Sequence, residues 1–197
     1  MTRIACIVVA HEPRKALVLE QVVPSALAQG FDDVVVVGNW SGDCTWVGAR
    51  YLCVEPLLHN TIDALVKRDV GTLATDADIL AYINDDHKFA PGFCAALREV
   101  LDEPWDVLVP HRVTYHKGRA ISLNNGEREG YCGGHGGVFR RHVITARPWS
   151  AHAHNRLWDV YSSFDMRLRG ARFAELLAAW KLGQAEIRNA ILIAFPR

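Results

Sequence analysis

The segment AYINDDHKFAPGF, residues 81 to 93, carries an apolar run into three consecutive polar residues and then into a proline. Its two adjacent carboxylates, Asp85 and Asp86, would repel one another without a cation beside them. A hard divalent ion fits, because Mg²⁺ and Mn²⁺ are commonly held by one or two carboxylates together with phosphate oxygens of a substrate. Capping of the following turn explains an Asp at this place equally well from the local sequence alone.

Other apolar runs in the first half indicate a parallel sheet. The runs IACIVVA (4–10) and DVVVVG (33–38) are continuous and β-branched, as expected of strands that are covered on both faces. Further strands are expected at 79–83 and 106–109. Because helical segments alternate with these strands, the sequence predicts a doubly wound α/β layer, whose ligands bind beyond the carboxyl ends of the strands. The polar residues 84–86 would lie at such an end.

The helices of this layer are indicated by spacing and by proline. Residues 14–29 have helical spacing, and Pro24 is expected to kink or divide that helix. Residues 61–73 form a second expected helix. Pro91 is expected at the first position of a third helix, over 92–101.

The second half is less regular. It contains short β-like pieces, a glycine-rich loop GYCGGHGG (130–137) and helical segments near 156–169 and 173–182. No internal repeat or linker interrupts the chain, so we expect a single domain over 1–197. Residues 1–110 would form a nucleotide-type half and residues 111–197 a more irregular second half.

Composition describes an ordinary globular protein. The 197 residues are 50% apolar and 22% charged, and the five scattered cysteines contain no CxxC pair, so neither a disulfide framework nor a zinc site is indicated. A reduced, cytoplasmic setting is expected. No stretch approaches the roughly 18 apolar residues of a membrane span. Charge is uneven, with 8 basic and 16 acidic residues through Pro110, against 14 basic and 6 acidic residues from His111 onward. The basic half is either a polyanion-binding face or merely an uneven surface.

The order of elements resembles the GT-A-type inverting nucleotide-sugar glycosyltransferases, in particular the large family 2-like group of bacterial and phage enzymes. The resemblance spans residues 4–173. It is carried by the segments IVVAHEPR (7–14), VVVVGNWSGD (34–43), KRDVGTLATDADILAYINDD (67–86), GGHGGVFRR (133–141) and WDVYSSFDMRLRGARF (158–173).

This resemblance implies a metal-dependent enzyme that moves a sugar from a nucleotide-sugar donor, a UDP-sugar by family frequency, to a hydroxyl acceptor with inversion. It implies an Mn²⁺ or Mg²⁺ ion held by Asp86 and Asp85, which neutralises the leaving diphosphate. The residues that it assigns to the nucleotide-sugar are Ala10, Glu12, Arg14, Gly38, Arg68, Asn84, Asp85 and His135.

Two positions depart from the family pattern. Gly38 stands where the family usually has an aspartate that recognises the base, so the identity of the base is open. Asn84 replaces the first acid of the family's DxD motif. That replacement leaves Asp86 as the metal ligand and Asp85 as a contact of the ribose or the metal.

Inversion needs a carboxylate that takes the proton of the acceptor hydroxyl, and Asp159 and Asp165 compete for this role. In a helix, Val160, Phe164 and Leu168 would form an apolar stripe. Asp165 would lie about 140° from Val160 and point largely to solvent, whereas Asp159 would lie about 100° away in the first turn. The helix dipole favours an ionised carboxylate there, so Asp159 is the preferred base.

The acceptor is open between a polyanion such as hydroxylated phage DNA and a phosphate-linked lipid or glycan. The arginines that could bind its phosphates are Arg147, Arg156, Arg167, Arg169 and Arg172. Two other functions remain. A nucleotidyltransferase would need a glycine-rich triphosphate loop, which the segment AHEPRKA (10–16) lacks. A non-catalytic nucleotide-sugar-binding module is favoured by Gly38 and Asn84, while Asp86 and Asp159 argue against it.

Overall fold

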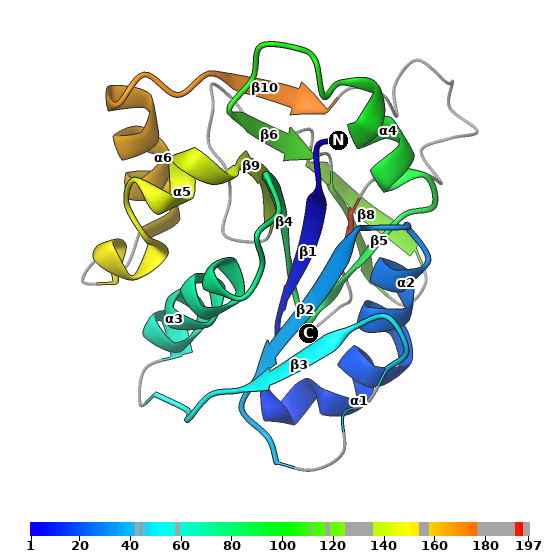
Figure 1. Ribbon diagram of the computed structural model, residues 1–197. Helices are drawn as coiled ribbons and strands as arrows, with labels where there is room; N and C mark the ends of the chain where they lie inside the picture. Colours follow the sequence, from blue (N-terminus) through cyan, green and yellow to red (C-terminus); the bar gives the residue numbers. More distant parts are fainter. Residues whose placement is uncertain are drawn as a thin grey trace.

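The computed structural model describes residues 1–41, 44, 46–57, 60–110, 112–116, 119–124, 136–153, 158–176 and 192–194. A seven-stranded sheet forms its centre (Figure 1), in the order β10-β6-β9-β4-β1-β2-β3. Strand β9 is antiparallel to both of its neighbours, and the other neighbouring pairs are parallel. The strands are β1 (Ile4–Val9), β2 (Asp33–Gly38), β3 (Arg50–Cys53), β4 (Ile79–Asn84), β6 (Val107–Pro110), β9 (Gly136–Arg140) and β10 (Phe173–Leu176).

The sheet confirms the α/β fold with a mostly parallel centre, and the four strands expected in the first half are present. Residues 173–182 were expected to be helical, and this expectation is wrong for 173–176. These residues instead form the edge strand β10, because Phe173 pairs with Val107 in parallel register. Backbone pairing with a neighbouring strand here overrides the local helical pattern. Residues 177–182 lie outside the described residues.

The first helical region is divided, as Pro24 predicts. It consists of η1 (Glu12–Arg14), α1 (Lys15–Leu17), the π-helical segment η2 (Val18–Val22) and α2 (Val23–Leu27). Pro24 has no N–H to donate to the carbonyl four residues earlier, and a wider helical turn is a common local adjustment to such a break.

The remaining helices are α3 (Asn60–Leu73), α4 (Phe93–Glu99), α5 (Arg141–Thr145), η3 (Trp149–His152) and α6 (Trp158–Leu168). Helix α4 begins later than expected. Gly92 is its N-cap residue, with a φ of 84°, so Pro91 precedes the helix instead of occupying its first position. Glycine tolerates this left-handed backbone, which a side chain rarely adopts.

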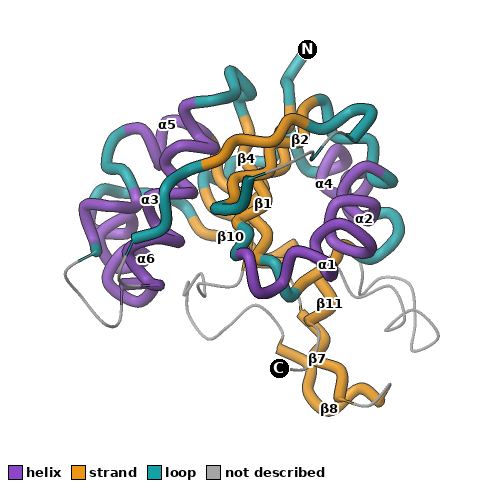
Figure 2. The backbone as a smooth tube through the Cα atoms, turned by 90° about the horizontal axis from the view of Figure 1, so that it is seen from below, coloured by secondary structure: helices purple, strands orange, loops and turns teal. Residues whose placement is uncertain are grey.

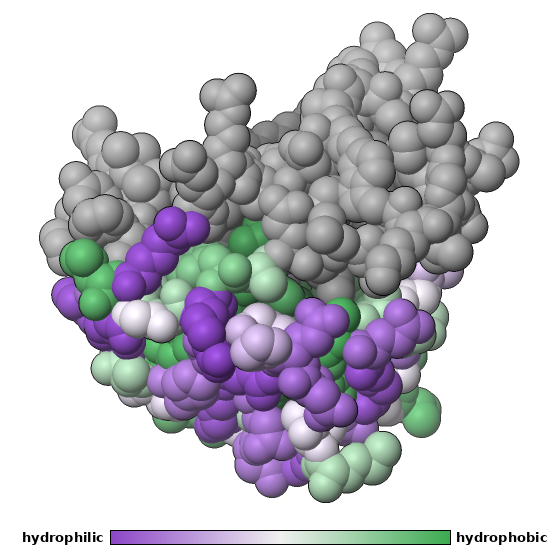
Figure 3. Space-filling model, turned by 90° about the horizontal axis from the view of Figure 1, so that it is seen from above, coloured by the Kyte–Doolittle hydropathy of each residue, from purple (hydrophilic) through white to green (hydrophobic). Residues whose placement is uncertain are grey.

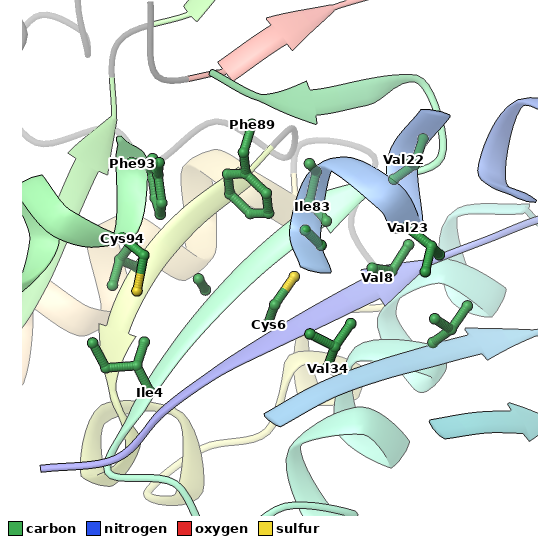
Figure 4. Packing of buried hydrophobic residues seen from close by; sticks show 14 of the residues in the cluster. Ile4, Cys6, Val8, Val22, Val23, Val34, Ile83, Phe89, Phe93 and Cys94 are labelled. Atoms are coloured by element: carbon green, nitrogen blue, oxygen red, sulfur yellow. The ribbon is translucent and has the colours of Figure 1, made fainter. Parts of the chain in front are cut away.

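Helices cover both faces of the large sheet. Helices α1, α2 and α4 lie on one face, and α3, α5 and α6 lie on the other (Figure 2). Strand β1 is buried along its whole length. Its side chains alternate, so Cys6 and Val8 pack toward α2 and α4 (Figure 4), while Ile7 packs on the α3 side.

Helix α3 approaches β1 closely at Gly71. A Cβ atom at this position would overlap the Cγ2 atom of Ile7. The missing side chain therefore sets the distance between α3 and the sheet, and with it the position of the polar residues that α3 carries.

A smaller sheet packs beside the large one. Its order is β5-β11-β7-β8, with β5 (His87–Phe89), β11 (Leu192–Ala194), β7 (Arg112–His116) and β8 (Arg119–Asn124). Residues 192–194, near the end of the sequence, thus pack on the rest of the described chain, because β11 pairs with β5 and β7. The described part of the surface seen from the end where β1 begins is mainly hydrophilic (Figure 3). Among the described residues, none of the helices combines the length and apolar character of a membrane span.

Candidate functional site

The candidate site lies at the carboxyl ends of β1 and β4, on the side of the sheet from which Figure 2 is viewed. The two strands are parallel neighbours, and Val9 pairs with Asn84 at their ends. The chain leaves β1 toward β2 on one side and reaches β4 on the other, so the strand order reverses here. Ligands of open α/β sheets bind in the crevice at such a reversal.

Asp85 is buried beside the segment that follows β1. Its Oδ2 atom accepts a hydrogen bond from the backbone N–H of His11 at 3.0 Å and lies 2.8 Å from His11 Nδ1. Its Oδ1 atom accepts from Nη1 of Arg14 at 2.6 Å. Arg14 and Asp85, which the sequence analysis assigned to one site, are therefore in direct contact.

Asp86 faces the same arginine. Its Oδ2 atom lies 2.9 Å from Arg14 Nη1, and its Oδ1 atom lies 2.6 Å from Nδ1 of the buried His87. Burial of Asp86 opposes its ionisation, but the hydrogen bond from His87 and the charge of Arg14 outweigh this effect and lower the pKa of Asp86 well below its ordinary value. Asp86 is consequently a carboxylate at neutral pH.

Helix α3 adds a buried ion pair that the sequence analysis did not identify. The Nζ atom of Lys67 lies 2.5 Å from Asp63 Oδ2 and donates to the carbonyl oxygen of Ala10 at 2.8 Å. Asp63 Oδ2 also lies 3.3 Å from Nε2 of His11. The spacing of four residues between Asp63 and Lys67 is visible in the sequence, but such pairs usually lie on solvated helix faces. Burial of Lys67 is the feature that the spacing could not predict.

Arg68 and Asn84 also meet at this site. Nη2 of Arg68 donates to Asn84 Oδ1 at 3.1 Å, and the guanidinium lies 5.6 Å from the ring centre of Tyr82 and 5.1 Å from that of Trp149. Arg68 is buried. Burial likewise raises the pKa of Tyr82 to about 12, although Thr72 and other neighbours oppose this change. Besides Arg14 and Lys67, the site therefore holds a third positively charged side chain, Arg68, close to β4.

Gly38, at the end of β2, lies under an aromatic pair. The rings of Trp40 and Tyr51 are stacked with centroids 5.1 Å apart, and a Cβ atom on Gly38 would lie 2.8 Å from each ring. The aspartate that the family has at this position does not fit here. The neighbouring Asn39 instead accepts a hydrogen bond from the backbone N–H of Glu12 at 2.9 Å, which ties the segment after β1 to the end of β2.

Two other predicted residues, Ala10 and Glu12, take part in the site through their backbones. Ala10 is buried and contributes its carbonyl oxygen to Lys67, so it holds the segment in place. Glu12 is exposed at the start of η1, and its contact with Asn39 is made by the backbone. His135 lies outside the described residues.

The two candidate bases differ in what surrounds them. Asp165 was expected to point largely to solvent, but its side chain is 20% exposed and lies 2.9 Å from both Arg147 Nη1 and Arg169 Nε. The arginines account for this difference, because they cover the carboxylate from two neighbouring segments. Asp159 is the second residue of α6, in its first turn as expected, and its side chain lies outside the described part.

The basic residues of the second half are partly neutralised within the fold. Besides the two arginines on Asp165, Arg172 binds Asp106 through Nε at 2.9 Å, and Arg167 lies over the ring of Phe173. Arg156 is outside the described residues. The excess of arginine in this half is therefore a weaker indication of a phosphate-binding surface than the sequence implied.

The carboxylates at the carboxyl end of β4 have the right chemistry for Mg²⁺ or Mn²⁺, since both ions prefer oxygen ligands. The described residues include no group of three or more His, Cys, Asp or Glu side chains placed to hold a metal ion. An ion here would therefore be held by one or two carboxylates, with the remaining ligands coming from substrate or water.

Comparisons with known proteins identify the fold. None of the protein-family models matches the sequence, and none of the curated proteins does. Among solved structures, TarS 1–349 of S. aureus in complex with UDP matches with a TM-score of 0.70 and 16% identity, covering 99% of this chain and 61% of that one. The same TarS fragment in complex with UDP-GlcNAc matches with a TM-score of 0.67 and 15% identity, covering 100% and 59%.

A third match is the mannosyltransferase PcManGT from Pyrobaculum calidifontis in complex with GDP-Man and Mn²⁺. Its TM-score is 0.62 at 12% identity, covering 88% of this chain and 54% of that one. The chain thus spans about 60% of the TarS fragment. These likenesses, together with the mixed seven-stranded sheet, identify the fold as that of GT-A glycosyltransferases.

Proposed function

We propose that this chain is a glycosyltransferase that moves a sugar from a nucleotide-sugar, a UDP-sugar in the first instance, to a hydroxyl acceptor with inversion. The observation that carries the proposal is the charged cluster at the carboxyl ends of β1 and β4, in a fold whose neighbours were solved with UDP, UDP-GlcNAc and GDP-Man. Residues 1–110 would bind the donor and residues 111–197 the acceptor. A reducing, cytoplasmic setting belongs to the same proposal, since Cys6 and Cys94 are buried free thiols.

The donor's diphosphate is assigned to the two arginines. Arg68 is fixed by Asn84 and by the aromatic rings, so its charge is preorganised for a leaving diphosphate. Arg14, one third exposed, presents a fork of N–H donors that matches phosphate oxygens. An Mn²⁺ or Mg²⁺ ion on Asp86, with Asp85 beside it, would neutralise the same oxygens when bound.

Base recognition is assigned to the loop between β1 and η1 and to the residues after β2. Because Gly38 cannot carry an acidic side chain under the Trp40–Tyr51 pair, this role passes to the neighbouring Asn39. A neutral amide both donates and accepts hydrogen bonds, so recognition by Asn39 in place of an aspartate leaves uracil and guanine as candidate bases.

The role of the base that takes the proton of the acceptor hydroxyl is assigned to Asp159. Both carboxylate oxygens of Asp165 form ion pairs, Oδ1 with Arg147 and Oδ2 with Arg169, so an acceptor hydroxyl would have to compete with two arginines for this side chain. Asp159 lies in the first turn of α6, where the helix dipole favours an ionised carboxylate. A phosphate-bearing acceptor, either hydroxylated DNA or a phosphate-linked glycan, remains the candidate class because residues 111–197 have a net positive charge.

Release of nucleoside diphosphate from UDP-, GDP- and dTDP-sugars in the presence of Mn²⁺ tests the proposal without a known acceptor. We expect slow hydrolysis of one donor, and a loss of about a hundredfold or more in Asp86→Asn, because a metal stabilises the leaving group by several kcal/mol. Asp102→Asn removes an exposed carboxylate from a turn and serves as the matched control.

Different outcomes separate the candidate functions. Equal rates of hydrolysis in Asp86→Asn and Asp102→Asn would show that Asp86 has no role in the reaction. Donor binding by calorimetry with no release from any donor would favour a nucleotide-sugar-binding module. Release of pyrophosphate from nucleoside triphosphates would instead favour a nucleotidyltransferase.

A further inference from the structure

A single nitrogen atom joins the two carboxylates of the candidate site. Nη1 of Arg14 lies 2.6 Å from Oδ1 of Asp85 and 2.9 Å from Oδ2 of Asp86. These two oxygens therefore converge on one positively charged group. A divalent ion bound by both of them would be about 2.0–2.6 Å from each oxygen, which is the space that the nitrogen occupies.

The remaining carboxylate oxygens have different partners. Oδ2 of Asp85 is held by the backbone and ring of His11, and Oδ1 of Asp86 is held by His87. The two histidines thus orient both carboxylates so that their other oxygens face Arg14. If the guanidinium left, these contacts would keep the two facing oxygens in place.

We propose that Arg14 is an exchangeable internal cation, which a divalent metal ion must displace from Asp85 and Asp86, and which then turns to the diphosphate of the donor. This inference rests on the proposed function. Without metal, the charge of Arg14 neutralises Asp85 and Asp86 and its guanidinium occupies the place of the metal ion. With metal bound, the ion takes over this role and Arg14 becomes a second cation that faces the phosphates.

The local structure permits this exchange. The side chain of Arg14 is 33% exposed, whereas those of Asp85 and Asp86 are largely buried. The short helix η1 is anchored by its backbone, since Arg14 N–H donates to His11 O at 3.0 Å and Glu12 N–H donates to Asn39. The guanidinium can therefore move without unfolding the segment. Its planar fork pairs well with phosphate oxygens, which replace the lost carboxylates.

The exchange couples metal binding to donor binding. Metal alone must displace a well-paired arginine and leave it without a partner. When a nucleoside diphosphate binds together with the metal, its phosphates provide that partner, so each ligand should increase the affinity for the other. Removal of the guanidinium should tighten the binding of metal alone and weaken this coupling.

Titration of Mn²⁺, followed by electron paramagnetic resonance with and without UDP, tests the inference independently of activity. For Arg14→Gln we expect the dissociation constant of Mn²⁺ alone to fall by about tenfold or more, the equivalent of about 1.4 kcal/mol per factor of ten. UDP should strengthen Mn²⁺ binding less in this variant than in the wild type. Arg14→Lys retains the charge and should bind Mn²⁺ nearly as weakly as the wild type.

Arg50→Gln is the matched control, because it removes the same charge from an ion pair with Asp33 at the opposite end of the sheet. It should leave Mn²⁺ affinity unchanged. A general effect of net charge would instead appear equally in Arg50→Gln and Arg14→Gln, and this result would overturn the inference.

A second measurement uses the wild-type protein, in case Arg14→Gln does not fold. The side-chain Nε–H signal of Arg14 in nitrogen NMR, assigned by its absence in Arg14→Lys, should shift when Mg²⁺ and UDP are added together. No shift at saturating ligand would contradict displacement.

Failure of the inference can be distinguished from failure of the proposed function. If the wild type binds Mn²⁺ and Arg14→Gln binds it equally or more weakly, the metal site stands and the exchange is wrong. If neither protein binds Mn²⁺ with or without UDP, the proposed metal site fails and the exchange fails with it.

Discussion

Replacement of Lys67 by Met removes a buried ammonium group and is expected to destabilise the fold strongly. Lys67 is fully buried, with Asp63 at 2.5 Å and the carbonyl oxygen of Ala10 at 2.8 Å as partners. Met fills a similar volume, so the effect comes from the charge. Asp63 would lose its ammonium partner, and the Ala10 carbonyl would lose its donor.

Breaking a buried pair by removing one partner costs about 3–5 kcal/mol. A chain of this size loses roughly 2–4 °C of melting temperature per kcal/mol, so Lys67→Met should melt about 6–20 °C below the wild type. Thermal melting and urea unfolding measure this difference. Arg3→Gln is the control, since it breaks an exposed ion pair with Asp76, worth about 1 kcal/mol or less.

The double variant Asp63→Asn with Lys67→Met separates charge from packing. Removing both charges avoids the unpaired carboxylate, so the double variant should be more stable than Lys67→Met alone. The amide oxygen introduced by Asp63→Asn can still accept the hydrogen bond that Leu57 N–H donates to Asp63 at 3.1 Å. A loss in Lys67→Met no larger than in Arg3→Gln, or a double variant less stable than both single variants, would refute the reasoning.

Three further outcomes are expected. Gly71→Ala places a Cβ atom against β1 and should lower stability by about 1–3 kcal/mol in urea unfolding, the usual range for overpacking. Hydrogen bonds from Arg172 lower the pKa of Asp106 in the folded state. The stabilisation that Asp106 provides, measured as the difference in melting temperature between the wild type and Asp106→Asn, should be complete above about pH 4, the pKa of an unfolded Asp. It should disappear as the pH falls through the lower pKa of the folded state. Asp159→Asn should reduce glycosyl transfer by about 10²–10⁴-fold in an acceptor assay, whereas Asp165→Asn should chiefly lower the melting temperature.

The central strands could be predicted because burial on both faces leaves a simple pattern. β1, β2 and β4 are continuous apolar runs, and a parallel sheet covered by helices requires such runs. The edge strand β10 could not be predicted in this way. Its residues have no such run, and only pairing with β6 makes them a strand.

The site was predictable where polar residues follow those strands. Asn84, Asp85 and Asp86 had to lie at the carboxyl end of β4, and Arg14 could be expected near them. Asp63 and Lys67 were missed, because their burial depends on how closely α3 approaches β1. Gly38 appeared to be a lost functional residue, whereas the structure gives it a packing role under two aromatic rings that no local pattern reveals.

The pairing of β5 with β11 has a consequence for synthesis on the ribosome. β5 begins at His87, next to Asp86, yet Phe89 finds its partner in Leu192, about 100 residues later. At about 5–20 residues per second, translation takes roughly 5–20 s to make that partner. Asp85, Asp86 and β5 are therefore synthesised long before β11, the strand that pairs with β5. Ribosomal pausing within this interval would prolong the period in which the β5 edge is open to wrong partners.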